Sequence, residues 1–138
     1  MGGTRCHPTP LADAYAGEAR GSIVTRVDFD STVTPREAGL GRFVKLSKPD
    51  FVGRNALAAR TAVERRLTGL RAAGDTAPPR GALVRNRRAR VVGRVTSACM
   101  SPTLGGALAL AYVEDGAAGG GLTIEGVHET ARPVGLPF

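Results

Sequence analysis

The sequence contains no tryptophan, only four phenylalanines and only two tyrosines, so aromatic residues make up 4% of its 138 positions. Surfaces that bind single-stranded nucleic acid rely on aromatic side chains that stack against the bases. This scarcity disfavours a nucleic-acid-binding module, although the formal net charge is +7. Because 17 of the 19 basic residues are arginines in an alanine- and glycine-rich chain, biased coding can account for much of that charge.

Cysteine and histidine are also scarce. Cys6 and Cys99 lie far apart, and His7 and His128 are the only imidazoles. No Cys-x-x-Cys or comparable ligand spacing is present, so we expect no metal site. Cys99 ends an apolar strand pattern, which favours a buried small side chain over a reactive thiol.

Long apolar runs are missing too. The longest covers residues 104–113 and is interrupted by two glycines, whereas a membrane helix needs about 20 apolar residues. No basic segment is followed by the apolar stretch of a signal peptide. We therefore expect a soluble, cytoplasmic chain with no membrane partner.

What the sequence does contain is a series of short, β-branched segments separated by turn residues. The segments expected as strands are 23–29, 42–46, 66–71, 82–85, 91–99, 107–113, 122–125 and 130–134. One helix is expected over 55–66, begun by Asp50 or Gly53. Thr34 can cap a short helical turn that Pro35 opens. This pattern predicts a mainly β fold: a small antiparallel β-barrel preceded by a strand–helix segment.

The strands at 82–85 and 91–99 are expected to form a hairpin with its tip at 86–90. Strict alternation places one set of residues of the second strand on one face: Val91, Gly93, Val95, Ser97 and Cys99. The other face then carries Val92, Arg94, Thr96 and Ala98. Gly93 inside this strand indicates a bulge or the close approach of another backbone.

Two carboxylates, Asp28 and Asp30, lie two residues apart at the end of a predicted strand, hence on one face. Such a pair can share a proton or act in acid–base catalysis. A solvated turn is the simpler interpretation, and we favour it. Glu37 is expected to hydrogen-bond backbone N–H groups in a structural role.

The densest positive charge lies on the hairpin, at Arg85, Arg87, Arg88, Arg90 and Arg94. It could bind phosphate or an acidic protein, but a solvated hairpin tip is the favoured interpretation. Three hydroxyl residues could be nucleophiles: Ser97, Ser101 and Thr103. A nucleophile needs a positioned base, and neither histidine can be assigned to that role. Residues 101–103 are better explained as a turn.

Residues 119–121 are three glycines, but no Lys-Ser/Thr follows as in a phosphate-binding loop. No residue is therefore assigned as catalytic, cofactor-binding or metal-binding.

Several segments, in this order, carry a family resemblance. Residues 28–41 (DFDSTVTPREAGLG) and 48–57 (KPDFVGRNAL) resemble the end of the folate-binding domain of the glycine-cleavage T-protein (aminomethyltransferase) family. Residues 92–97 (VGRVTS), 101–105 (SPTLG), 109–113 (ALAYV) and 136–138 (LPF) resemble its C-terminal barrel. Related modules occur in dimethylglycine dehydrogenase, sarcosine dehydrogenase and the sarcosine oxidase α subunit.

The resemblance implies three parts: an irregular leader at 1–25, the end of a folate-binding domain at 26–64, and the C-terminal β-barrel at 65–138. It implies tetrahydrofolate as cofactor, which accepts the carbon of an aminomethyl group carried on a lipoyl protein while ammonia is released. The implied partners are a folate-binding domain or chain and a lipoyl carrier protein. The arginine cluster could then bind the polyglutamate tail of a folate.

The chain departs from the family pattern upstream of Asp28. The family's catalytic Asp precedes the matched region, and residues 17–22 and 25–26 differ from the family's Arg-Leu-Glu-x-Gly and Tyr-Gly segments. We therefore expect a truncated C-terminal module that is not active alone. The alternative is a non-catalytic remnant or subunit that docks on a separate folate-binding chain of the sarcosine/dimethylglycine type.

Overall fold

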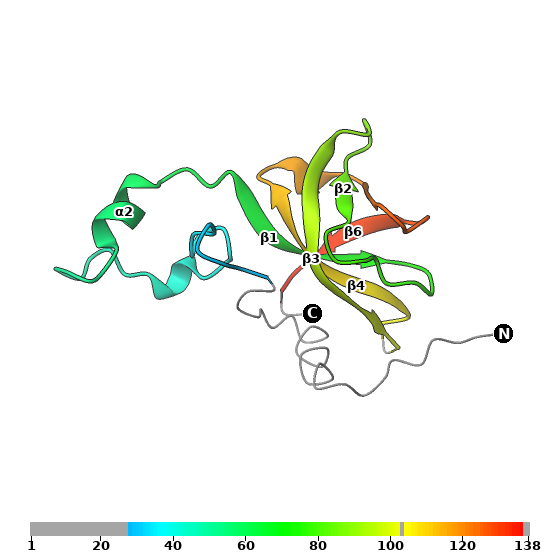
Figure 1. The fold of residues 1–138 in the computed structure, drawn as a ribbon, viewed down its shortest axis with the longest axis horizontal. Helices are drawn as coiled ribbons and strands as arrows, with labels where there is room; N and C mark the ends of the chain where they lie inside the picture. The colour runs from blue at the N-terminus through cyan, green and yellow to red at the C-terminus, as the bar shows by residue number, and fades with distance from the viewer. Residues whose placement is uncertain (1–27, 103, 137–138) are drawn as a thin grey trace.

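The computed structural model describes residues 28–102 and 104–136. Most of them form a closed barrel, with an irregular arm to one side (Figure 1). The strands are β1 (Arg65–Ala72), β2 (Leu83–Arg85), β3 (Val91–Ser101), β4 (Gly106–Glu114), β5 (Leu122–Ile124) and β6 (Thr130–Val134). Their order around the barrel is β1-β4-β3-β2-β5-β6, every pair is antiparallel, and β6 pairs back onto β1. The predicted mainly β fold with a small antiparallel barrel is confirmed.

Small and branched aliphatic side chains form the main core. Its members are Leu70, Ala72, Ala82, Val84, Val92, Val95, Ala109, Ala111, Val113, Leu122, Ile124 and Ala131. Strand β4 is buried along its whole length up to Val113, which explains its continuous apolar run. Burying one Val, Leu or Ile side chain contributes about 1.5–3 kcal/mol before entropy costs, so this core holds the barrel together.

Strand β3 departs from strict alternation. Its register against β4 shifts after Val95, so that Val95 pairs with Ala111 while Ala98 pairs with Ala109. Since Ala109 and Ala111 lie on one face of β4, Val95 and Ala98 also share a face. The prediction that put them on opposite faces is wrong, because a β-bulge adds one residue to β3 at this point.

The close approach predicted at Gly93 is confirmed. A Cβ atom placed on Gly93 would lie 2.3 Å from the carbonyl oxygen of Tyr112 and 3.1 Å from the Cα of Val113. Both groups belong to the backbone of β4 and cannot rotate away. The contact between β3 and β4 therefore requires glycine here.

The tip of the β2–β3 hairpin is built around Asn86. Its side-chain oxygen accepts hydrogen bonds from the backbone N–H groups of Arg88 (3.0 Å) and Arg90 (3.1 Å). Ala89 completes the turn with φ 59°, the one positive φ of a non-glycine residue in the described part of the chain. A left-handed conformation costs an L-residue about 1–2 kcal/mol, so this turn is strained at one position.

Replacing Ala89 with glycine is expected to raise the free energy of unfolding by about 0.5–1 kcal/mol. Glycine adopts the left-handed conformation without that cost, although its more flexible unfolded state offsets part of the gain. Urea denaturation of the two proteins measures the difference. Ala89→Val should lower the stability instead, and a glycine variant no more stable than the parent would contradict the account.

The arm between the first described residues and β1 contains two short helices, η1 (Gly41–Phe43) and α2 (Arg54–Ala59). The strand predicted at 42–46 is wrong. The N–H of Phe43 donates to the carbonyl of Leu40 (3.0 Å), and the N–H of Val44 donates to that of Gly41 (3.0 Å). These local bonds form a 3₁₀ turn, and in residues 28–102 and 104–136 no strand pairs with this segment.

The predicted helix at 55–66 is shorter than expected. It begins after Gly53, which has φ 86°, and ends at Ala59. Arg65 and Arg66 instead pair with β4 as the first residues of β1. Tertiary pairing thus overrides the helical pattern at its carboxyl end.

No residue between 39 and 64 is buried, and Phe43 (68% exposed) and Val52 (104%) are open to solvent. Figure 1 shows this arm standing away from the barrel. The strand predicted at 23–29 lies mostly outside the described residues, which include only Asp28 in a turn and Phe29 in a bridge. The predicted leader, 1–25, lies wholly outside them.

Candidate functional site

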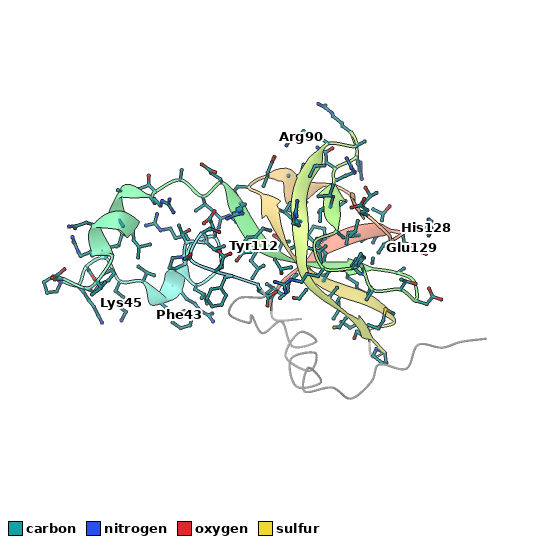
Figure 2. All side chains as sticks on the ribbon, in the orientation of Figure 1. Phe43, Lys45, Arg90, Tyr112, His128 and Glu129 are labelled. Atoms are coloured by element: carbon teal, nitrogen blue, oxygen red, sulfur yellow. The ribbon has the colours of Figure 1, made fainter. Side chains whose placement is uncertain are left out.

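A cavity of about 330 Å³ lies where residues 28–33 cross the outer face of β1, β3 and β4. Its lining residues are Asp28, Phe29, Asp30, Thr32, Val33, Arg65, Arg80, Val92, Arg94, Thr96, Tyr112 and Glu114. Strand pairing brings several of them together, because Tyr112 is the partner of Arg94 on β3 and of Leu67 on β1. Figure 2 shows Tyr112 on the side of the barrel next to the arm.

Asp28 is one of the lining residues of this cavity and is only 1% exposed. Its Oδ1 accepts hydrogen bonds from the hydroxyls of Thr96 (2.7 Å) and Ser97 (2.6 Å). The β3 bulge lets these two consecutive side chains reach one carboxylate, which strict alternation would forbid. The solvated-turn interpretation is therefore wrong for Asp28: its carboxylate is buried and stabilised by hydrogen bonds.

Asp30 behaves differently and is exposed. Its Oδ1 accepts hydrogen bonds from the backbone N–H (2.8 Å) and the hydroxyl (2.6 Å) of Thr32. The side-chain bond and then the backbone bond hold the pKa of Asp30 below its ordinary value. The solvated turn is confirmed here, and the two carboxylates accept from different partners.

Glu37 fastens the arm to the barrel. Its Oε2 accepts from the N–H (2.8 Å) and hydroxyl (2.9 Å) of Thr34, while the N–H of Glu37 donates to the Thr34 hydroxyl (3.3 Å). This reciprocal arrangement is a capping box; the Thr34–Pro35 pattern predicted Thr34 as a cap, and the structure adds Glu37 as its partner. Arg65 of β1 donates to Oε1 (3.3 Å), and the N–H of Leu67 donates to the Glu37 carbonyl (2.8 Å). The expected structural role of Glu37 is confirmed.

Burial alone would raise the pKa of Glu37, but the bonds from Thr34 and the ion pair with Arg65 outweigh it and lower the pKa below 4.5. A carboxylate with a lowered folded-state pKa stabilises the fold above its unfolded pKa, and this contribution is lost as the pH falls through the folded pKa. We expect Glu37→Gln to lower the free energy of unfolding by about 1 kcal/mol at pH 7. The difference in unfolding free energy between the variant and the parent should become smaller below about pH 4.5.

Urea denaturation at several pH values between 7 and 3 tests this expectation. Asp115→Asn is the matched control, because Asp115 is exposed and pairs only with Arg66 at the surface. An unfolding difference for Glu37→Gln that stayed constant from pH 7 to 3 would show that ionisation of Glu37 does not stabilise the capping box.

Tyr112 is one of the residues that line the cavity. The residue is 7% exposed, and within the described ranges its buried hydroxyl has no hydrogen-bond partner. The Arg65 guanidinium lies over the ring, 5.2 Å from its centroid. Burial raises the pKa of Tyr112 to about 12, although Arg65 opposes the shift, and Asp28 adds to it. The hydroxyl is therefore a protonated donor at neutral pH. The sequence analysis did not identify Tyr112 as a site residue. The available signal was that Tyr112 is the one polar side chain in the apolar segment 107–113.

The five arginines predicted as one cluster have different partners and positions in the structure. Arg85 donates to the carbonyl of Ala89 (3.2 Å), and Arg90 forms an ion pair with Glu114. Arg87 and Arg88 are exposed at the hairpin tip, where Figure 2 shows Arg90. Arg94 lies apart from them, because it faces the cavity beside Tyr112.

The other candidate residues lie in ordinary structural positions. Ser101 accepts a hydrogen bond from the N–H of Leu104 (3.3 Å), as expected for a turn, while Thr103 and His7 lie outside the described residues. His128 is exposed, at the edge of the barrel away from Tyr112 (Figure 2). Cys99 is buried, as predicted. Residues 117–119 of the glycine-rich stretch form a short 3₁₀ helix, η2 (Ala117–Gly119).

Among residues 28–102 and 104–136, no three His, Cys, Asp or Glu side chains are grouped as metal ligands would be. Over the same ranges, no helix has the length and apolarity to cross a membrane.

Comparison with known proteins shows a family model and several relatives that this chain resembles. The family model described as the glycine cleavage T-protein C-terminal barrel domain matches residues 65–138. The chain is 43% identical over 122 residues to an aminomethyltransferase from Streptomyces avermitilis, covering 80% of this chain and 32% of that protein. It is 47% identical over 88 residues to an aminomethyltransferase from Thermosynechococcus vestitus, and this match covers 62% of this chain and 24% of that protein.

Among solved structures, glycine cleavage system aminomethyltransferase T from Bartonella henselae superimposes with a TM-score of 0.73 at 25% identity. The superposition covers 87% of this chain and 36% of that one. The chain thus spans about a third of the length of the curated relatives from Streptomyces and Saccharopolyspora that it matches.

Proposed function

Because the chain belongs to the glycine cleavage T-protein family through its C-terminal barrel domain, we propose that it is the barrel module of a tetrahydrofolate-dependent aminomethyl-transfer protein. In this proposal the module works with a folate-binding domain, against which the barrel and its arm pack. A lipoyl carrier protein would present the aminomethyl group to this assembly. The cytoplasmic location expected from the sequence remains a prediction.

The exposed arm is the observation that carries this proposal. Residues 39–64 contain no buried side chain, and Phe43 and Val52 present apolar surface to solvent. Exposed apolar surface of this kind is typical of a face that another domain covers. The Glu37–Arg65 ion pair (3.3 Å) joins the base of the arm to β1, so a domain docked on the arm would be held by the barrel.

The cavities beside the arm fit a complete folate poorly. They measure about 330 and 480 Å³, and the larger is lined mainly by polar and small residues of the 32–37 and 59–65 segments. Sites for ring-containing ligands are lined mainly by apolar and aromatic side chains, and Phe29 and Tyr112 are the aromatic residues in either lining. We therefore assign no cofactor-binding residue to this chain. Bound tetrahydrofolate would supply the carbon acceptor, and the barrel would close one wall of its site.

Docking can be tested with the separately expressed folate-binding portion of the Streptomyces avermitilis relative. Sedimentation velocity of the mixture is expected to show a one-to-one complex. The variant Phe43→Ser/Val52→Ser should weaken it at least about tenfold, since each buried apolar side chain is worth about 1.5–3 kcal/mol. The matched control is Met100→Ser, because Met100 is an exposed apolar residue of the barrel (38%).

A mixture without complex formation would count against the proposal, as would an arm variant that binds as well as the parent. A complex that forms but has no transfer activity would favour the alternative of a non-catalytic docking subunit.

A further inference from the structure

Two neighbouring residues that line the cavity on the barrel carry hydrogen-bond donors. Arg94 on β3 and Tyr112 on β4 are directly paired across the two strands, and both line the cavity. Directly opposed residues have Cβ atoms about 4.5–5.5 Å apart, so their polar ends can reach one ligand. The Tyr112 hydroxyl is buried and has no partner among the residues that the structure describes. In the described part of the chain, Arg94 makes no ion pair with an acid.

The acidic residues around this pair already have donors. Asp28 accepts from Thr96 and Ser97, and Asp30 accepts from Thr32. Both carboxylate oxygens of Glu114 accept from Arg90 at the hairpin tip. In the described part of the chain, none of these acids uses the donors of Arg94 and Tyr112, so this pair suits a ligand that accepts hydrogen bonds.

We propose that Arg94 and Tyr112 form a binding site for an oxyanion, either the carboxylate of a small organic acid or a phosphate group. The arginine fork can donate two parallel hydrogen bonds to such a group, and the tyrosine hydroxyl adds a third. A volume of about 330 Å³ lies at the lower end of small-molecule sites, so the site takes a small anion or the end of a larger one. The site adjoins the base of the arm, but it uses neither Phe43 nor Val52, the exposed residues on which the proposed function rests, and it does not depend on that proposal.

The burial of the hydroxyl gives the inference its physical basis. A buried hydroxyl without a partner costs about 1–3 kcal/mol, and a bound oxyanion would remove that cost. The ligand would therefore gain from the hydroxyl in addition to the charge of Arg94. A purely electrostatic patch, such as the hairpin tip, would gain only from charge.

Isothermal titration calorimetry of the purified chain with glutarate and with inorganic phosphate tests the site. At least one of these anions should bind. The anion that binds more tightly shows whether the site prefers a carboxylate or a phosphate group. Tyr112→Phe should weaken binding about fivefold to tenfold and Arg94→Gln at least about tenfold, as expected for the loss of one or two hydrogen bonds to a charged group. Arg88→Gln, which removes the same charge from the exposed hairpin tip, should leave the affinity unchanged.

The melting temperature supplies a second readout. In ligand-free protein, Tyr112→Phe should raise the melting temperature by a few degrees, because it removes an unpartnered buried hydroxyl. In the presence of the anion the same variant should gain less stability from the ligand than the parent does. The proposal is overturned if neither anion binds, if the three variants lose affinity equally, or if Tyr112→Phe lowers the ligand-free melting temperature.

Discussion

Replacing Gly93 with alanine is expected to lower the free energy of unfolding by about 3 kcal/mol or more. The added Cβ would lie 2.3 Å from the carbonyl oxygen of Tyr112, a distance that real Cβ atoms do not show. The carbonyl belongs to the backbone of β4, so relief requires β3 and β4 to separate. Overpacked cores typically lose about 1–3 kcal/mol even when side chains can move, and here the obstacle is main chain. Urea denaturation followed by circular dichroism measures the loss.

Gly119→Ala is the matched control for this prediction. Nothing lies within 4 Å of a Cβ atom placed on Gly119, and its backbone is not left-handed. Its stability should change by less than about 0.5 kcal/mol, as for most surface substitutions. If both alanine variants were equally stable, β3 and β4 would not pack as closely as the structure has them.

Replacing Asp28 with alanine is expected to lower the free energy of unfolding by about 2–4 kcal/mol. The substitution removes the acceptor that Thr96 (2.7 Å) and Ser97 (2.6 Å) share. Ser97 is 5% exposed, so water cannot readily replace the lost carboxylate. A buried donor left without an acceptor costs about 1–3 kcal/mol. Asp50→Ala is the control, because Asp50 is exposed on the arm, and its effect should stay below about 0.5 kcal/mol.

A double-mutant cycle separates this network from a general effect of losing Asp28. Combining Asp28→Ala with Ser97→Ala should cost less than the sum of the two single losses, because the second change removes one orphaned hydroxyl. The expected coupling is about 1 kcal/mol or more. Strictly additive losses would mean that Asp28 and Ser97 do not interact in solution.

Local patterns predicted the barrel well, because its strands are short and bounded by turn residues. The strand expected at 130–134 agrees with β6, and the strand expected at 107–113 is one residue shorter at each end than β4. The segment at 42–46 shows the limit of this reasoning. Alternation describes how a strand would present its side chains, but a strand forms only where a neighbour can pair with it.

The candidate site depended on information that the sequence does not carry locally. Asp28 and Ser97 are 69 residues apart, and only the fold shows that the bulge in β3 brings them together. The opposition of Arg94 and Tyr112 depends on the register between β3 and β4, which the bulge shifts. The cap at Thr34 was different, because the adjacent Pro35 marked a short helical turn within the local sequence.

The central claim is that this chain completes a folate-binding domain and does not bind folate by itself. Tetrahydrofolate affinity measured on three samples tests it most directly: this chain, the folate-binding portion of the Streptomyces avermitilis relative, and their mixture. The account expects no rise in melting temperature for the chain alone, since a ligand that does not bind the native state cannot stabilise it. It expects the mixture to bind tetrahydrofolate at least about tenfold more tightly than the folate-binding portion alone, a coupling of about 1.4 kcal/mol. A folate-induced rise for this chain alone, or a mixture that binds no better than the folate-binding portion, would contradict the account.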